Sequence, residues 1–236
     1  METREPDSRA KEFASKRQQL GRLIRRRGFT NEAVLDAILQ VSREQFVPDD
    51  FRDQAYFDQP LPIGKNQTIS QPFVVAMMTD ALSLGPSDRV LEIGTGSGYA
   101  AAVISRIAKH VDTVERHVEL AESAARRLAQ LGYDNVQVHF GDGTHGWPER
   151  APYDAIVVAA GGPQVPPSLT DQLAVGGRLV MPVGKHRSVQ QLIRMRRLSE
   201  DRFEEEDLGG VSFVPLVGAA GWDAADSSFP STRARR

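Results

Sequence analysis

Short apolar stretches alternate with helical segments through the middle of this chain, and this alternation is the strongest constraint on its fold. The sequence predicts buried strands over residues 89–93, 110–115, 136–140, 155–159 and 177–183. It predicts helices between them over 99–109, 118–131 and near 169–173. Strands that alternate with helices pair in parallel and are covered on both faces. We therefore expect an α/β fold with a doubly wound, Rossmann-like sheet.

The flanking segments follow other patterns. Helical spacing predicts N-terminal helices over 8–27, 30–39 and 71–84, with Thr30 as the N-cap of the second. The segment 47–66, rich in aromatic residues and proline, shows no sustained period, so we expect an ordered loop region there.

After the sheet, we expect an antiparallel hairpin with strands over 191–198 and 211–217, joined by the acidic stretch 200–207. The run Glu204-Glu205-Glu206 is then expected in a solvent-exposed turn. Small and polar residues predict a flexible tail over 218–236. We expect residues 1–217 to form a single domain, made of an N-terminal helical and substrate-loop region (8–84), an α/β core (85–184) and C-terminal strands (190–217).

A glycine-rich loop follows the first predicted strand of the sheet. Gly94, Gly96 and Gly98 lie where the carboxyl ends of parallel strands bind ligands. The spacing G-x-G-x-G differs from the G-x-G-x-x-G that cradles a dinucleotide pyrophosphate. Glu92, just before the loop, would repel a pyrophosphate but suits a cofactor with a sulfonium and an ammonium group. These features favour S-adenosyl-L-methionine over a nicotinamide cofactor, and binding of a nicotinamide cofactor would instead identify a dehydrogenase.

Acidic residues end the next two strands. Glu115 lies about twenty residues after the loop, where an acidic side chain accepts hydrogen bonds from ribose hydroxyls. Asp142 follows the third strand and is placed to accept from an adenine amino group. The structural alternatives are a surface charge for Glu115 and an Asp-Gly turn for Asp142. Three signals at neighbouring strand ends favour a cofactor site.

Several stretches between about Val41 and Val217 match a known family. The most specific is Leu61-Pro62-Ile63-Gly64-Lys65-Asn66-Gln67-Thr68-Ile69-Ser70-Gln71-Pro72. Others are Arg43-Glu44-Gln45-Phe46-Val47-Pro48, Val90 to Tyr99 and Phe213-Val214-Pro215-Leu216. In these motifs the chain closely resembles the protein-L-isoaspartate O-methyltransferases.

The resemblance implies a reaction and a set of site residues. Members of this family repair damaged proteins by methylating the α-carboxyl of L-isoaspartyl residues, with S-adenosyl-L-methionine as methyl donor. The active-site serine falls on Ser70, within a substrate-binding segment that comprises Gln67, Thr68, Ile69 and Ser70. The cofactor contacts fall on Glu92, Ile93, Gly94, Thr95, Gly96, Ser97, Gly98, Glu115, Asp142 and Gly143.

The chemistry of methyl transfer fits a site without a catalytic dyad. The substrate carboxylate, with an unperturbed pKa near ~4, is already ionised at neutral pH and needs no general base. Ser70 is expected to donate a hydrogen bond that orients this carboxylate. The alternative role for Ser70 is to cap the helix that follows it, because Ser-Gln-Pro is typical of a helix start.

Composition excludes some classes and favours others. The charge of -2 gives no basic excess for nucleic acid, and a chain without cysteine has no thiolate metal site or disulfide. Five histidines without ligand spacing predict no metal, and we expect a cytoplasmic monomer without a membrane span. Two further hypotheses stay open: a relative that methylates aspartate in a dedicated partner, and a binding module without activity.

Overall fold

The fold is built around one seven-stranded sheet. The structure is a computed structural model and describes residues 6–186 and 189–223. The strand order is β5-β4-β3-β6-β7-β8-β9. The strands are β3 (Arg89–Ile93), β4 (His110–Glu115), β5 (Val136–Phe140), β6 (Tyr153–Val158), β7 (Leu173–His186), β8 (Val189–Arg197) and β9 (Phe203–Val211). The first five in this order are parallel, and β8 and β9 continue the sheet in antiparallel pairing. The expected α/β fold is confirmed.

The order of the strands creates a crevice at one edge of the sheet. The chain runs outward from β3 through β4 to β5, and then returns to the other side of β3 with β6 and β7. This reversal between β3 and β6 is a topological switch point, where the loops after the two strands separate and leave room for a ligand. The glycine-rich loop follows β3 at this point.

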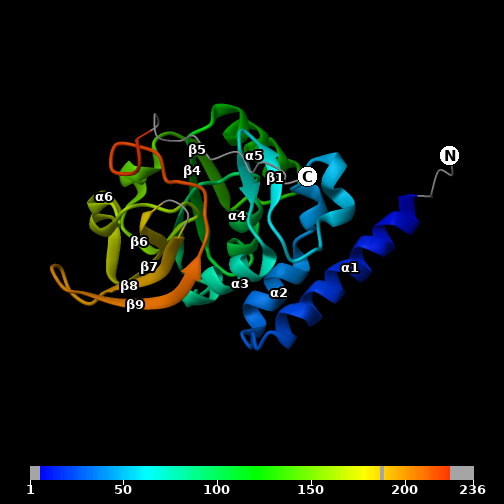
Figure 1. The fold of residues 1–236 in the computed structure, drawn as a ribbon, viewed down its shortest axis with the longest axis horizontal. Helices are drawn as coiled ribbons and strands as arrows, with labels where there is room; N and C mark the ends of the chain where they lie inside the picture. The colour runs from blue at the N-terminus through cyan, green and yellow to red at the C-terminus, as the bar shows by residue number, and fades with distance from the viewer. Residues whose placement is uncertain (1–5, 187–188, 224–236) are drawn as a thin grey trace, which may run out of the picture.

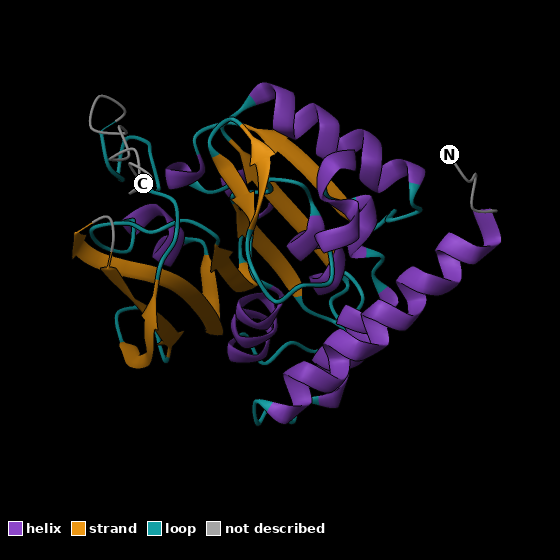
Figure 2. Ribbon diagram, turned by 45° about the vertical axis from the view of Figure 1, so that its right-hand side comes forward, coloured by secondary structure: helices purple, strands orange, loops and turns teal. Residues whose placement is uncertain are grey.

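Helices cover the sheet on both sides (Figures 1 and 2). They are α1 (Pro6–Arg26), α2 (Glu32–Gln40), α3 (Pro72–Ala81), α4 (Tyr99–Ile104), α5 (Val118–Gln130) and α6 (Pro167–Asp171). Short 3-10 helices span Arg43–Gln45, Asp49–Gln54, Gly143–His145 and Pro148–Arg150. The alternation along β3 shows the two layers: Val90 packs with residues of α3 and α4, whereas Leu91 packs with Leu169 of α6.

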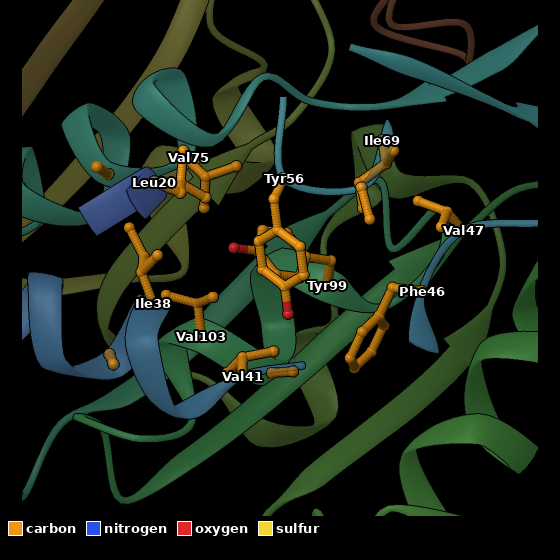
Figure 3. Packing of buried hydrophobic residues seen from close by; sticks show 14 of the residues in the cluster. Leu20, Ile38, Val41, Phe46, Val47, Tyr56, Ile69, Val75, Tyr99 and Val103 are labelled. Carbon is orange, nitrogen blue, oxygen red and sulfur yellow. The ribbon is translucent and has the colours of Figure 1, made fainter. Parts of the chain in front are cut away.

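The N-terminal region forms its own apolar cluster against the sheet. Figure 3 shows Phe46, Tyr56 and Tyr99 packed together in this cluster, and the rings of Phe46 and Tyr99 lie 5.7 Å apart in an edge-to-face arrangement. Aromatic pairs in this arrangement contribute about 0.5–1.5 kcal/mol beyond the area they bury. Because Tyr99 begins α4, this packing joins the N-terminal helices to the helix that follows the glycine loop.

Two expectations for this region are wrong in detail. The N-cap of α2 is Asn31 rather than Thr30, since the Asn31 side chain accepts a hydrogen bond from the backbone N–H of Val34. The segment 47–66 is also more ordered than a loop. It contains the 3-10 helix Asp49–Gln54 and the strand β1 (Leu61–Gly64), which pairs with β2 (Gln67–Ile69) as an antiparallel hairpin.

The C-terminal hairpin differs from the expectation in its second strand, whereas β8 (Val189–Arg197) lies close to the predicted strand 191–198. Its second strand, β9, contains the acidic run Glu204–Glu206, which was predicted to be a turn. Pairing with β8 places Arg194 opposite Glu206 and Arg196 opposite Glu204, so opposite charges stabilise the acidic run in a strand. The turn lies at Leu198–Arg202 instead, where the Leu198 N–H donates to the Arg202 carbonyl over 2.7 Å.

The residues after β9 are irregular but anchored (red in Figure 1). The predicted strand 211–217 forms isolated bridges, because Pro215 has no N–H for a continuous ladder. The start of the predicted flexible tail is hydrogen-bonded: the Ala219 N–H donates to Asp142 over 2.8 Å, and the Trp222 indole N–H donates to the Gly161 carbonyl over 3.0 Å. The rest of the predicted tail, 224–236, lies outside the described residues.

The length and composition of the helices decide whether any of them can span a membrane. Within 6–186 and 189–223, each helix is too short or too polar to cross a bilayer.

Arg178 of β7 ties the sheet to the turn that follows α3. Its guanidinium donates to the carbonyls of Leu82 over 2.5 Å and Asp154 over 3.1 Å, and forms an ion pair with Asp88 at 2.7 Å. We predict that Arg178→Ala lowers the free energy of unfolding by about 2–4 kcal/mol, because partly buried acceptors lose their donor. Urea unfolding measures this change.

Arg196 of β8 provides a matched control, because it is an exposed arginine of the same sheet. Arg196→Ala removes only an exposed cross-strand pair with Glu204, so it should lower the free energy of unfolding by less than about 1 kcal/mol. Equal losses in the two variants would contradict the role assigned to Arg178.

Candidate functional site

The glycine loop has a backbone shape that glycine adopts without strain. Gly94, Gly96 and Gly98 have φ values of 94°, 53° and 88°, in the left-handed region that a side chain disfavours. A methyl group on Gly96 would also lie 3.1 Å from the end of Ile63 in β1. The loop therefore leaves its backbone open and approaches the β1–β2 hairpin closely.

A cavity at the switch point collects most of the predicted site residues. The loop contributes Ile93 to Ser97, the end of β4 contributes Glu115, and the hairpin contributes Gln67 to Ser70. Gly143, Ala159, Ala160 and the segment Val214–Val217 close the remaining sides. Of the predicted cofactor residues, the lining includes Ile93, Gly94, Thr95, Gly96, Ser97, Glu115 and Gly143, and it does not include Glu92, Gly98 and Asp142.

Glu115 holds the cofactor loop to the end of β4. One carboxylate oxygen accepts a hydrogen bond from the Gly96 N–H over 2.9 Å, and the other accepts from the His117 N–H over 2.9 Å. The side chain is 4% exposed. Each oxygen has a further lone pair, so the carboxylate can accept from ligand hydroxyls while it holds the loop.

Glu92 is buried beneath the loop. One of its oxygens accepts from the Thr113 hydroxyl over 2.6 Å, and the other, Oε1, is buried without a hydrogen-bond partner among the described residues. Burial, with a smaller contribution from the charge of Glu115, raises the pKa of the Glu92 carboxyl to about 8, although the hydrogen bond from Thr113 opposes this shift. A cationic group bound in the cavity would stabilise the ionised form of Glu92. The two carboxylates therefore fit a positively charged cofactor and not a pyrophosphate.

Asp142 has partners within the chain. One carboxylate oxygen caps the 3-10 helix Gly143–His145 by accepting from the Thr144 N–H over 2.9 Å, and the other accepts from the Ala219 N–H over 2.8 Å. Burial opposes ionisation of Asp142, but these hydrogen bonds outweigh it and lower the pKa of the carboxyl. The structure thus gives Asp142 an anchoring role, and its contact with an adenine group stays a prediction.

Ser70 lies where the cofactor cavity meets a second, larger groove. This groove has a volume of about 1300 Å³ and runs between α3 and the ends of β8 and β9. Gln67, Thr68, Ser70, Ala159 and Val214 line both spaces. The groove lining contains no charged side chain among the described residues. A donor in the first space and an acceptor in the second would therefore meet beside the Ser70 hydroxyl.

The predicted alternative for Ser70 was to cap α3, and a different residue has that role. The Phe73 N–H at the start of α3 donates to Asp58 over 2.9 Å. The Ser70 hydroxyl has no hydrogen bond to any other described residue. It therefore remains available to a ligand.

A buried arginine, which sequence reasoning did not single out, fixes the backbone at Ser70. Arg43 is 0% exposed, and its guanidinium donates to the Ser70 carbonyl over 2.9 Å and to the Ala55 carbonyl over 2.8 Å. The same group lies 4.6 Å from the centre of the Tyr99 ring, within the range of a cation–π interaction. Arg43 therefore connects Ser70 to the start of the helix that follows the glycine loop.

Two other contributions were also missed. Arg127 of α5 donates to the Ser97 carbonyl over 2.9 Å and so supports the loop from behind. The segment Val214–Val217 was predicted to be an ordinary strand, yet it lines the cofactor cavity. No group of three or more His, Cys, Asp or Glu residues with metal-binding geometry occurs in the described ranges.

Comparison with known proteins gives a consistent family. The family model described as Protein-L-isoaspartate(D-aspartate) O-methyltransferase (PCMT) matches residues 14–221. A protein-L-isoaspartate O-methyltransferase of Rhodopseudomonas palustris is 57% identical over 212 residues, which cover 90% of this chain and 97% of the relative. A protein-L-isoaspartate O-methyltransferase 2 of Pelobacter propionicus is 63% identical over 196 residues, 83% of this chain and 87% of the relative.

Solved structures agree with the fold. A protein-L-isoaspartate O-methyltransferase structure superposes with a TM-score of 0.79 at 31% identity and covers 87% of this chain and 67% of that one. A structure from Plasmodium falciparum, described as a putative protein-L-isoaspartate O-methyltransferase in complex with S-adenosyl-L-homocysteine, has a similar fold, with a TM-score of 0.73 at 24% identity. The match covers 85% of this chain and 98% of the Plasmodium chain.

The buried Glu92 predicts a particular dependence of stability on pH. The pKa of Glu92 is about 8 in the folded chain, whereas its ordinary value, expected in the unfolded chain, is 4.5. Between these two pH values the folded state therefore holds a proton that the unfolded state has lost. The free energy of unfolding therefore falls as the pH rises through this window. We predict that the unaltered chain loses about 2 kcal/mol more than Glu92→Gln between pH 6 and pH 8.

Urea unfolding at the two pH values measures this difference. Glu149→Gln serves as the control, because Glu149 is exposed and should leave the pH dependence unchanged. An identical pH dependence in Glu92→Gln and the unaltered chain would show that Glu92 is ionised throughout, contrary to the prediction.

Proposed function

Because this chain belongs to the protein-L-isoaspartate(D-aspartate) O-methyltransferase family, we propose that it repairs damaged proteins by methylating the α-carboxyl of L-isoaspartyl residues. The methyl donor is S-adenosyl-L-methionine. The observation that carries the proposal is the junction of two spaces at Ser70, one lined by the glycine loop and the other an uncharged groove open to an extended peptide.

The residues at the first space suit this donor. When bound, S-adenosyl-L-methionine would supply a methyl group on a cationic sulfur. A carboxylate oxygen would bond to this methyl group in line as the sulfur leaves. We propose that Gly94 to Ser97 bind it through their open backbone and that Glu115 accepts hydrogen bonds from its hydroxyl groups. Glu92 favours the positive charge from beneath the loop, and Gly143 borders the space beyond Glu115, next to the anchoring residue Asp142.

The acceptor requires orientation and not activation. An isoaspartyl α-carboxylate is ionised at neutral pH, so its oxygen attacks without the help of a base. The Ser70 hydroxyl donates a hydrogen bond that fixes this carboxylate at the junction, and Gln67, Thr68 and Ile69 shape the wall beside it. The main contribution of the protein is then to bring two reactants together in line and away from water.

The shape and lining of the groove suit a segment of a protein as the methyl acceptor. Its lining includes Pro60, Phe73 and Met77 together with Gly210 to Phe213. A flexible segment of a damaged protein can enter such a groove, whereas a folded surface cannot. Action in the cytoplasm, as a monomer and on proteins and not nucleic acids, remains part of the proposal.

Methyl transfer to matched peptides tests the proposed function. With radiolabelled donor, the chain should methylate an isoaspartyl hexapeptide and leave the aspartyl peptide of the same sequence unmodified. The two peptides differ only in which carboxylate is free, so the comparison isolates recognition of that group. Preference for the aspartyl peptide would contradict repair and indicate a dedicated partner. Transfer to neither peptide would contradict the proposed activity.

The role of Ser70 is tested in the same assay. We predict that Ser70→Ala lowers kcat/KM for the isoaspartyl peptide by roughly 10- to 100-fold, the effect of one hydrogen bond to a charged group. Ser199→Ala, in an exposed turn, is the control and should leave kcat/KM unchanged. Near-normal activity of a stably folded Ser70→Ala variant would contradict the assignment.

A further inference from the structure

One segment of the chain separates the donor space from the acceptor groove. The residues Gly210 to Val214, at the end of β9 and just after it, line the groove, and Val214 to Val217 line the cofactor cavity. The position of this dividing segment, residues 212–217, therefore sets the shape of both spaces.

Backbone contacts anchor the cavity side of the dividing segment. The Gly161 N–H donates to the Val214 carbonyl and the Leu216 N–H donates to the Gly161 carbonyl, each over 2.8 Å. Farther along, the Ala219 N–H donates to Asp142 over 2.8 Å and the Trp222 N–H donates to the Leu216 carbonyl over 2.7 Å. The cavity side is thus held by several independent bonds.

On the groove side, the side chain of Gln190 makes the hydrogen bonds that are described for Phe213. Strand pairing ends where Gln190 of β8 lies opposite Val211 of β9. Two residues later, the Phe213 N–H donates to the Gln190 Oε1 over 2.8 Å, and the Gln190 Nε2 donates to the Phe213 carbonyl over 3.4 Å. The Gln190 amide thereby takes the place of a backbone peptide of the sheet and continues the ladder beyond its last pair.

Gln190 is enclosed in a way that fixes this geometry. Its side chain is 1% exposed and packs closely on Gly161, because a methyl group at that glycine would lie 2.7 Å from the Gln190 amide carbon. Gln190 also lines the acceptor groove, together with its neighbour Val189. A buried amide with both of its polar atoms engaged has little freedom to turn.

We propose that Gln190 is a positioning residue for the acceptor: it holds Phe213 so that the groove beside Ser70 fits the isoaspartyl peptide. This inference rests on the proposed function. Loss of the amide would remove the hydrogen bonds that the Phe213 N–H and carbonyl make among the described residues, and would loosen the groove side of the dividing segment. The Gly161 and Asp142 contacts would still hold the cavity side, so donor binding would be preserved.

Gln190→Met tests the proposal, because methionine keeps the length and approximate volume of glutamine and lacks the amide. We expect the KM for the isoaspartyl peptide to rise roughly tenfold, as follows from the loss of two hydrogen bonds. We expect kcat to change less than about threefold and the Kd for S-adenosyl-L-homocysteine, measured by calorimetry, less than about twofold. Hydrogen exchange should speed up at the Phe213 amide and not at the Leu216 amide.

Gln191→Met is the matched control, because Gln191 is the adjacent glutamine of β8 and its side chain is exposed. Gln191→Met should leave both the KM for the isoaspartyl peptide and the Kd for S-adenosyl-L-homocysteine unchanged. Should Gln190→Met fail to fold, Gln190→Leu provides a second replacement of similar volume. An unchanged peptide KM in the folded variant would overturn the proposal, because packing without the amide would then be enough to hold Phe213 in place. An equal loss of donor affinity would also overturn it. Absence of methyl transfer by the unaltered chain would instead contradict the proposed function, and the inference with it.

Discussion

The contact between Glu115 and the glycine loop is the interaction on which the site depends. A loop with three glycines has many accessible conformations, and one carboxylate selects among them by accepting from the Gly96 N–H and the His117 N–H. Because the carboxylate lies at the end of β4, the loop after β3 takes its position from the neighbouring strand of a rigid sheet. The same group faces the cavity, so the residue that shapes the site is also available to its ligand.

A second set of contacts positions the β1–β2 hairpin and Ser70 relative to the glycine loop. The hairpin that ends in Ser70 lies outside the parallel sheet, and its position relative to the loop is not given by strand pairing. Arg43 provides the connection, with one guanidinium that contacts the Ser70 carbonyl, the Ala55 carbonyl and the Tyr99 ring. Burial of such a cation is costly unless it is hydrogen-bonded. Nε and Nη2 make such bonds, whereas Nη1 is buried without a hydrogen-bond partner among the described residues. Asp58 caps α3 and leaves the Ser70 hydroxyl open to the junction.

The parallel core could be predicted from sequence because its strands are short segments rich in apolar and β-branched residues that alternate with helical segments. The positions of Gly96 and Glu115 followed from that pattern, since residues at the carboxyl ends of parallel strands meet at one edge. The acidic strand β9 could not be predicted in this way, because Glu204 to Glu206 are stabilised by arginines of β8 that lie some ten residues away in sequence. Arg43 and Gln190 were missed for a related reason: their roles come from backbone groups that they meet only in the fold. The anchoring of Ala219 by Asp142 is a contact of the same kind.

The central claim is that donor and acceptor occupy two spaces that meet at Ser70. A crystal structure of the chain with S-adenosyl-L-homocysteine and an isoaspartyl peptide tests it most directly. The account predicts that the nucleoside lies in the cavity beside Glu115 and the peptide in the groove beneath Phe213, with the isoaspartyl α-carboxylate about 2.6–3.2 Å from the Ser70 hydroxyl oxygen. A peptide bound outside this groove, or a carboxylate oriented by another residue and out of reach of Ser70, would contradict it.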